Sequence, residues 1–273
     1  GFGMLELFVL LEEQGRALLC APFFSTTVLA ATALLEGGTE ELKQEWLPAI
    51  ATGEAIGTFA DVGAMQAIRS GEKWILSGSK RFVVDGHVAD FVVISADSGG
   101  HTELSVVDTA SIAVRQVNSL DATRRLAEIH LDGVSVPETS RLDGGAETRG
   151  HVLACAAVGL AAEQVGGAAR CLEMAVGHAK DRRQFGRPIG SFQAIKHRCA
   201  DMQIAVEAAR AAAMYAAWAI SERSEEIATS VPLAKAFCSE AFYRCAAENI
   251  QIHGGIGFTW EHDAHLYFKR AKS

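Results

Sequence analysis

Residues 181–193 read DRRQFGRPIGSFQ, and this stretch decides how the rest of the chain is organised. It interrupts two long alanine-rich helical patterns with a corner that contains glycine and proline, the residues that turn a chain sharply. Arg182, Arg183 and Arg187 lie in this corner, although the chain carries a formal net charge of −8. A turn between two helices needs glycine and proline, but it does not need three guanidinium groups. The sequence therefore predicts a helical hairpin whose corner binds an anionic partner.

On both sides of the corner, apolar residues recur every three to five positions, which indicates long amphipathic helices. The first pattern begins near Thr148, a third helix is predicted over about 229–250, and a fourth begins near Trp260. Long helices with small residues on their facing sides are typical of a four-helix bundle. The apolar positions of the first two patterns are Leu153, Ala157, Leu160, Val165, Ala168, Leu172, Val176 and Ala179, then Ile195, Cys199, Met202, Val206, Ala209, Ala213, Ala216 and Ile220.

The N-terminal part of the chain predicts short packed helices. Residues 4–18 and 25–36 carry apolar side chains at helical spacing. Thr39 can cap a third helix, with Glu40 and Glu41 in the first turn, where the helix dipole favours carboxylates.

After about residue 53 the pattern changes to short β-branched or aromatic runs, separated by turns that contain glycine. This spacing is typical of a small antiparallel sandwich or barrel. The predicted fold class is therefore α+β, with an N-terminal helical domain at 1–53, a β domain at 54–137 and a C-terminal four-helix bundle at 138–273. The predicted strands include 74–76, 81–84, 91–94, 104–107, 113–117 and 129–131.

The composition limits the possible partners. The net negative charge argues against a general nucleic-acid binder, so an anion site must be local. Six cysteines without CxxC pairing favour reduced, packed thiols in a cytoplasmic protein. Neither a signal peptide nor an apolar run of roughly 20 residues is visible, so no membrane partner is expected. The apolar pattern starts directly after Gly3, as in a protein whose first part is missing.

Two further segments carry specific information. Residues 251–258 read QIHGGIGF, and glycines there let a ligand approach the backbone, whose N–H groups can hold an anion. Residues 38–48 read GTEELKQEWLP. Together with the corner at 181–193, and in this order around a β domain, they closely resemble the acyl-CoA dehydrogenase family. The resemblance covers the whole chain except for a missing N-terminal helical stretch and a short C-terminal end.

The resemblance implies a flavoprotein that uses FAD to dehydrogenate an acyl-CoA. A base takes a proton from Cα and the flavin takes a hydride from Cβ, which leaves a 2-enoyl-CoA. It also implies a homo- or hetero-tetramer with FAD at subunit interfaces, and electron-transfer flavoprotein as the acceptor.

Several positions match cofactor-binding residues of the family. By this resemblance, Arg182 pairs with the FAD diphosphate, which a guanidinium binds bidentately, and Phe185 packs near it and reaches toward a neighbouring subunit. If the sequence did not also contain the QIHGGIGF segment, the simpler interpretation of Arg182 would be a solvated arginine at a helix end. The remaining matches are Gln193 beside the cofactor, and Gln251, Gly254 and Gly255 along its adenosine end.

The β domain departs from the family pattern. Where the family usually carries a Thr-Glu-Pro-Gly-Ala-Gly-Ser-Asp loop over the flavin, residues 59–66 read FADVGAMQ and match poorly. In the strand that lines the flavin ring, Phe82 keeps an aromatic wall, but Val84 has no hydroxyl for N5. Plain strand core is an equally good interpretation of both residues. The flavin end of the cofactor would then lie mostly in another chain.

No catalytic residue is assigned from the sequence. The reaction needs a carboxylate whose pKa is raised by burial. In most of the family this glutamate would lie beyond Ser273, and in some members it lies at the start of the first bundle helix, where this chain has Arg149. Glu147 is out of register, and Glu163 is expected to form a hydrogen bond within the packed helices.

Residues 260–267 read WEHDAHLY and resemble a bacterial subgroup that includes heteromeric enzymes for CoA thioesters of steroid side chains. In these, one subunit type lacks the base. No metal is expected at Glu261 and His265, because no second ligand cluster matches them. Two hypotheses follow: a dehydrogenase subunit of fatty acid or steroid degradation, or a non-catalytic partner that completes the FAD site of a base-bearing chain. A weaker third is a nitroalkane-type oxidase with an aspartate base.

Overall fold

The computed structural model describes residues 3–273, which form two compact units. The helical unit contains residues 3–20, 120–123 and 157–273. The β unit contains residues 21–119 and 124–156.

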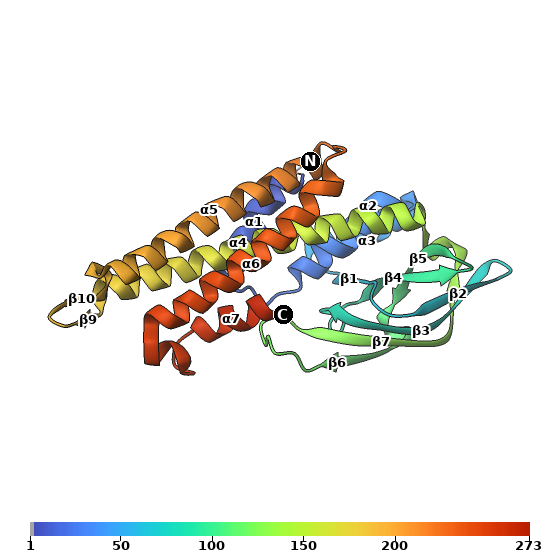
Figure 1. Ribbon diagram of the computed structural model, residues 1–273. Coiled ribbons are helices and arrows are strands. Elements are labelled where there is room, and N and C mark those ends of the chain that lie inside the picture. Colours follow the sequence, from blue (N-terminus) through green and yellow to red (C-terminus); the bar gives the residue numbers. More distant parts are fainter. Residues whose placement is uncertain (1–2) are drawn as a thin grey trace. The chain divides into compact units, whose positions relative to one another are not determined.

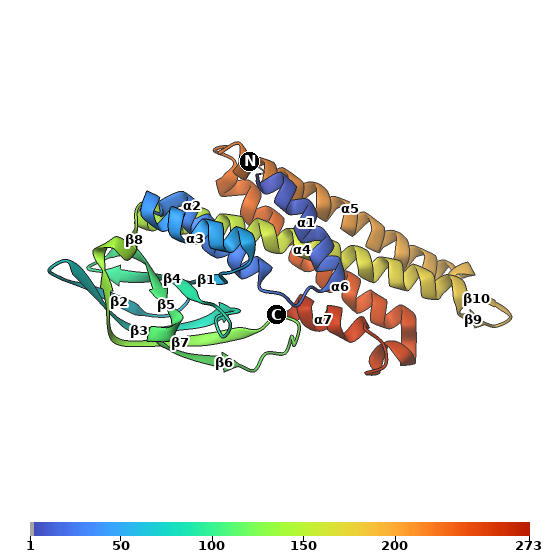
Figure 2. The same ribbon diagram turned by 180° about the vertical axis from the view of Figure 1, so that it is seen from behind.

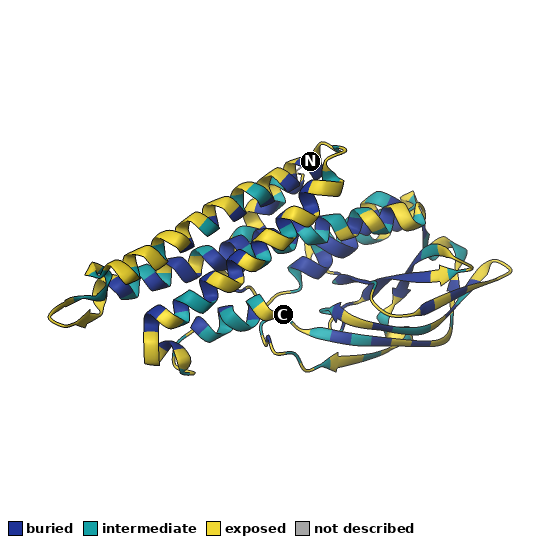
Figure 3. Cartoon of the chain, in the orientation of Figure 1, coloured by how far each residue is buried: buried dark blue, intermediate teal, exposed yellow. Residues whose placement is uncertain are grey.

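The helical unit is a bundle of long helices with a core of small and medium-sized side chains. Figures 1 and 2 show α4, α5 and α6 running side by side. Ala168, Ala175 and Cys245 are fully buried at the contacts, where small residues let helices approach closely. Figure 3 shows the buried residues as stripes along the helices. The predicted apolar face matches these stripes from Val165 onward, but Leu153 is 38% exposed. The helices of this unit are α1 (Met4–Ala17), the C-terminal part of α4 (Gly145–Asp181), α5 (Gln193–Ser221), α6 (Ile227–His253) and α7 (Ala264–Lys272).

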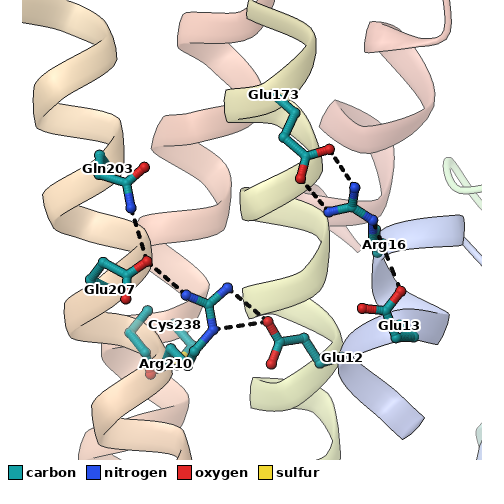
Figure 4. Close-up of polar contacts among 9 residues, drawn as sticks. Glu12, Glu13, Arg16, Glu173, Gln203, Glu207, Arg210 and Cys238 are labelled. Atoms are coloured by element: carbon teal, nitrogen blue, oxygen red, sulfur yellow. Dashed lines mark hydrogen bonds and ion pairs between the residues drawn. The ribbon is translucent and has the colours of Figure 1, made fainter. Parts of the chain in front are cut away.

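Two ion-pair groups hold α1 against its neighbours (Figure 4). Arg16 donates two hydrogen bonds of 2.5 Å to the carboxylate of Glu173 on α4. Arg210 on α5 donates to Glu12 at 2.8 and 2.9 Å. Because α1 precedes the other helices of the unit by more than 100 residues, these contacts join distant parts of the chain.

The helices of the β unit begin with an element that the sequence did not predict. The expected helix at 25–36 is a π-helix, η1 (Phe24–Ala30), that continues as α2 (Ala31–Gly37). Before α3 (Glu40–Thr52), the Thr39 side chain accepts a hydrogen bond of 3.3 Å from the Leu42 N–H, which confirms the predicted cap. The same helix ends at Gly53, whose φ of 77° belongs to the left-handed region.

The β unit is built on an eight-stranded sheet in the order β6-β7-β3-β2-β4-β5-β8, with β1 paired to β4. Most neighbours are antiparallel as predicted, but β4 pairs in parallel with both β1 and β2, so the sheet is mixed. Strand β3 is antiparallel to β2 and lies between β2 and β4 in sequence, which lets the chain return in the same direction. The predicted runs at 74–76 and 81–84 form one strand, interrupted by register shifts. The strands are β1 (Gly57–Ala60), β2 (Met65–Ser70), β3 (Lys73–Val84), β4 (Phe91–Ser98), β5 (His101–Asp108), β6 (Ala113–Val117), β7 (Leu126–Pro137) and β8 (Arg141–Leu142).

Helix α4 is long and apolar enough to cross a membrane by length and composition alone. Its most apolar 18-residue window is 61% buried inside the protein, which is the burial of a core helix in a soluble fold. N-terminal helices, a central sheet and C-terminal helices together confirm the α+β fold class. The domain boundaries at 53 and 137 stay a prediction.

Candidate functional site

The arginine corner, residues 181–193, closes the hairpin between α4 and α5. Two short strands, β9 (Arg183–Gln184) and β10 (Arg187–Pro188), flank a turn at Phe185 and Gly186. The φ values of these two residues are 52° and 75°, so the turn needs the left-handed region twice in succession. Phe185 is 91% exposed in the single chain. Such exposure is expected of an apolar side chain that another subunit would cover.

Arg182 has a fixed backbone and a free side chain. Its N–H donates to the His178 carbonyl at 2.8 Å, and its own carbonyl accepts from the Ile189 N–H at 2.8 Å. The residue is exposed, and among residues 3–273 its guanidinium forms no hydrogen bond or ion pair. Arg187 differs, because its guanidinium lies 4.0 Å from the centre of the Phe192 ring. Arg182 is therefore held in place through its backbone and open to a ligand.

The glycine-rich loop follows α6 at the same end of the helical unit. Gly254 has a φ of 63° and opens a 3-10 turn, η5 (Gly254–Phe258), and a Cβ on Gly254 or Gly255 would meet nothing within 4 Å. Both glycines and Gln251 are exposed. The Gly254 N–H is bonded to the Ile250 and Gln251 carbonyls, so what this surface offers is backbone without side chains in front of it, which suits the close approach of a planar ligand.

A column of three imidazoles joins the glycine-rich loop to the corner. The His253 ring lies 4.3 Å from the His178 ring and 4.2 Å from the His262 ring, measured between centroids. His178 is one turn before Arg182, and His253 directly precedes Gly254. Arg182, Gln251, Gly254 and Gly255 are thus brought to one end of the bundle. Gln193, at the first position of α5, is exposed and follows the same hairpin.

Sequence reasoning did not identify this histidine column. The three residues come from α4, from α6 and from the segment before α7, so no local spacing reveals them. The available signal was that His253 lies inside the QIHGGIGF motif. His262 lies inside the segment that carries the resemblance to the steroid subgroup.

The β unit holds the other two predicted cofactor residues, both on β3. Phe82 has a φ of 56° and is 60% exposed, so its ring is outside the core. A non-glycine residue in this conformation is strained, and such strain is concentrated at functional sites. Val84 is half-buried, and its carbonyl accepts a hydrogen bond of 2.7 Å from the Thr58 hydroxyl. The register shift between Lys80 and Val83 produces this local geometry.

A charged cluster occupies the segment that replaces the family's flavin loop. Arg149 donates two hydrogen bonds to the Asp61 carboxylate, Nε to Oδ1 at 2.5 Å and Nη2 to Oδ2 at 2.8 Å. The Ser95 hydroxyl donates to the same carboxylate at 2.8 Å. Lys80 is 3% exposed, and its Nζ donates to the Asp61 carbonyl, the Gly63 carbonyl and the Ser95 hydroxyl at 2.7–3.1 Å. These residues line a cavity of about 300 Å³ together with Ala64, Met65, Gln66, Ala96, Asp97 and Thr102.

The electrostatics of the cluster follow from burial and pairing. Burial raises the pKa of Asp61, but hydrogen bonds from Arg149 and Ser95 outweigh this effect and hold the pKa below its usual value. Burial lowers the pKa of Lys80 to about 8, although Asp61 opposes the change. A carboxylate with a lowered pKa and three donors is a weak base. Asp61 is therefore poorly suited to act as a general base.

The remaining carboxylates discussed from the sequence also have defined places. Glu147 is exposed in the first turn of α4. Glu163 is buried, and Oε2 lies 3.6 Å from Nη1 of Arg270, so it belongs to an ion-pair network in the helical unit. Among residues 3–273, no group of three or more histidine, cysteine, aspartate or glutamate side chains is arranged to hold a metal ion.

The fold, with N-terminal helices, a central sheet and C-terminal helices, is that of a flavoprotein dehydrogenase, and sequence comparison identifies the family. Residues 1–54 match the acyl-CoA dehydrogenase N-terminal domain, and residues 143–273 match the acyl-CoA dehydrogenase C-terminal domain. The chain belongs to the acyl-CoA dehydrogenase family. Members of this family are FAD-dependent oxidoreductases that act on the CH–CH bond of acyl-CoA thioesters.

Individual relatives point to the same family. The chain is 39% identical to the acyl-CoA dehydrogenase IpdE2 of Mycobacterium tuberculosis, over 99% of this chain and 72% of the relative. It resembles the structure of the ChsE4-ChsE5 complex from Mycobacterium tuberculosis with a TM-score of 0.94 and 32% identity, covering 100% of this chain and 76% of that one. A Tcur3481-Tcur3483 steroid ACAD matches with a TM-score of 0.89 and 30% identity, over 99% of this chain and 75% of that one.

Proposed function

We propose that this chain is an FAD-dependent acyl-CoA dehydrogenase subunit whose arginine corner binds the diphosphate of FAD. The observation that carries the proposal is the exposed guanidinium of Arg182, at the end of the bundle where the ring contact between His178 and His253 also brings the open Gly254–Gly255 backbone. A diphosphate accepts paired hydrogen bonds from a guanidinium, so these residues fit the cofactor. When bound, FAD supplies the acceptor for the hydride. The chain's own residues fix the diphosphate and leave room for the adenosine.

Replacing Arg182 by glutamine is expected to weaken FAD binding about 10- to 100-fold, since charge-assisted hydrogen bonds contribute about 1.5–3 kcal/mol. Arg183→Gln removes the same charge from the next residue and is expected to change the affinity less than about threefold. Flavin fluorescence titration of the purified proteins gives both dissociation constants. Equal losses in the two variants would reduce the corner to a general electrostatic attraction and contradict a specific role for Arg182.

A second candidate is a non-catalytic partner that completes the FAD site of a base-bearing chain. The observation that favours it is the ion pair between Asp61 and Arg149. It places a paired arginine at the position where some relatives carry their base, and it occupies the segment that replaces the flavin loop. Phe82 and Val84 would then contact little or no flavin. The name of the ChsE4-ChsE5 complex states that such chains assemble with a different subunit.

Co-expression distinguishes the two candidates. For a partner subunit we expect the chain to bind well below one FAD per chain when purified alone, and turnover of acyl-CoA only after assembly with a second chain encoded beside it. Flavin absorbance per chain and reduction by acyl-CoA are the measurements. Stoichiometric flavin and turnover by the isolated chain would exclude the partner-subunit candidate and leave the first one intact.

The finer assignments form part of the same proposal. A steroid side-chain thioester is the substrate class favoured by the similarity to a solved steroid ACAD. Electron-transfer flavoprotein is the proposed acceptor, the cytoplasm the proposed location, and a homo- or hetero-tetramer with FAD at its interfaces the proposed assembly. The proposed contacts to the cofactor remain those of Phe185, Gln193 and Gln251, in addition to Arg182 and the two glycines.

A further inference from the structure

The imidazole column lies where the proposed diphosphate site meets the end of the bundle. His253 is buried, and its Nδ1 donates a hydrogen bond of 2.8 Å to the Asn249 carbonyl. That bond fixes the Nδ1–H tautomer and leaves Nε2 as an acceptor. The rings of His178 and His262 both lie tilted against this ring, with interplanar angles of 31° and 45°. Protonating all three contacting imidazole rings at once would be energetically unfavourable.

Burial and the neighbouring positive charges oppose protonation of His178 and His253. Burial lowers the pKa of His178, and the positive charges of Arg182 and His262 lower it further, while Asp181 acts in the opposite direction. Burial also lowers the pKa of His253, with smaller contributions from His262 and His178. From the segment before α7, Glu261 and Asp263 flank His262, and Lys269 lies over the Trp260 ring at 4.1 Å from its centre. His178 and His253 are therefore neutral at neutral pH.

Arg182 connects this column to the ligand. It lies one helical turn after His178, and its positive charge acts on that imidazole. An anion bound to the Arg182 guanidinium would neutralise most of this positive charge. The charged form of His178 would then be less disfavoured. Because linkage is reciprocal, protonation of the column must then strengthen anion binding by the same factor.

We propose that FAD binding at the arginine corner is coupled to proton uptake by His178 and His253 of the imidazole column. This inference rests on the proposed function, since it takes Arg182 as the diphosphate ligand. It assigns a regulatory role to residues that the family resemblance leaves without one. Without a bound anion, the folded protein becomes less stable as the pH falls. The pKa values of His178 and His253 are lower in the folded state than in the unfolded state, so their contribution to the free energy of unfolding is lost as the pH falls from about 7.5 through 6.5. With FAD bound, this loss is reduced.

The test measures the FAD dissociation constant of the full chain at about pH 8 and about pH 6. The diphosphate of FAD is a diester that does not titrate in this range, so a change in affinity belongs to the protein. One unit of pKa coupling corresponds to tenfold in affinity, and we expect FAD to bind about three- to tenfold more tightly at the lower pH. His178→Gln should reduce this ratio to below about 1.5. His197→Gln, which changes an exposed histidine on α5, should keep the wild-type ratio.

The outcomes separate this inference from the proposal on which it rests. Absence of FAD binding at both pH values would refute the FAD site itself. Binding with no pH dependence, or a ratio that His178→Gln leaves unchanged, would overturn the coupling and leave the site standing. A measurement without flavin is an independent test of the coupling. In an NMR titration, Arg182→Gln should raise the pKa of His178, and Arg183→Gln should raise it less. An unchanged pKa of His178 in Arg182→Gln also overturns the coupling.

Discussion

Replacing Gly166 by alanine is expected to destabilise the helical unit by about 4 kcal/mol or more, or to prevent its folding. A Cβ at this position would lie 1.8 Å from the Glu12 carbonyl oxygen and 2.8 Å from the Arg16 nitrogen. Both obstacles are backbone atoms of α1, so no side chain can move aside. At the same crossing, a Cβ on Gly15 would lie 2.0 Å from the Glu163 carbonyl oxygen. Two glycines thus allow α1 and α4 to touch backbone to backbone.

The matched control is Gly177→Ala on the same helix. A Cβ at Gly177 would meet nothing within 4 Å, and alanine is the better helix former by roughly 0.5–1 kcal/mol, so this variant should be as stable as the parent or slightly more stable. Urea unfolding followed by far-UV circular dichroism compares the three proteins. A stability loss below about 1 kcal/mol for Gly166→Ala would mean that α1 can shift outward without cost, contrary to the close contact in the structure.

Sequence patterns predicted the individual helices and strands better than they predicted which of these elements pair with one another. The hairpin at 181–193 follows from glycine and proline between two helical periods, and the Thr39 cap follows from local hydrogen bonding. The parallel pairing of β1 with β4 could not be predicted, because strand direction in a sheet depends on which strands meet and not on local alternation. The π-helix at Phe24–Ala30 has a hydrogen-bond pattern that no local residue signal specifies.

For the candidate site, the family motifs predicted which segments matter, and the structure adds how some of them meet. Arg182 and Gly254 are 72 positions apart in sequence, and only the fold brings their segments together through His178 and His253. The ion pair between Asp61 and Arg149 joins residues 88 positions apart. In the sequence, Arg149 was notable only because it stands where some members of the family carry their base. Its pairing with the altered loop segment is a tertiary feature that neither residue reveals alone.

Replacing Asp121 by alanine is expected to cost the helical unit about 3–5 kcal/mol, because it leaves the charge of Arg270 buried without its nearest partner. Arg270 is 9% exposed, and its Nε donates to Asp121 Oδ2 at 2.6 Å. Its Nη2 donates to the Thr123 hydroxyl at 2.7 Å, which itself donates to Asp121 Oδ1 at 2.5 Å. Without Asp121, the neighbouring carboxylate is that of Glu163, at 3.6 Å.

An exposed pair on the same unit provides the control. Asp201 and Arg244 lie 3.5 Å apart with side chains 58% and 55% exposed, so Asp201→Ala should cost less than about 1 kcal/mol. The double variant Asp121→Ala/Arg270→Met removes both charges, and it should be more stable than Asp121→Ala alone, because the cost comes from the unpaired charge and not from the lost contact. Unfolding free energies of the parent, of the single variants Asp121→Ala, Arg270→Met and Asp201→Ala, and of the double variant provide this comparison. If the double variant loses as much as the sum of the two single variants, the buried charge is not the cause, and Asp121 acts on Thr123 and the 120–123 segment independently of Arg270.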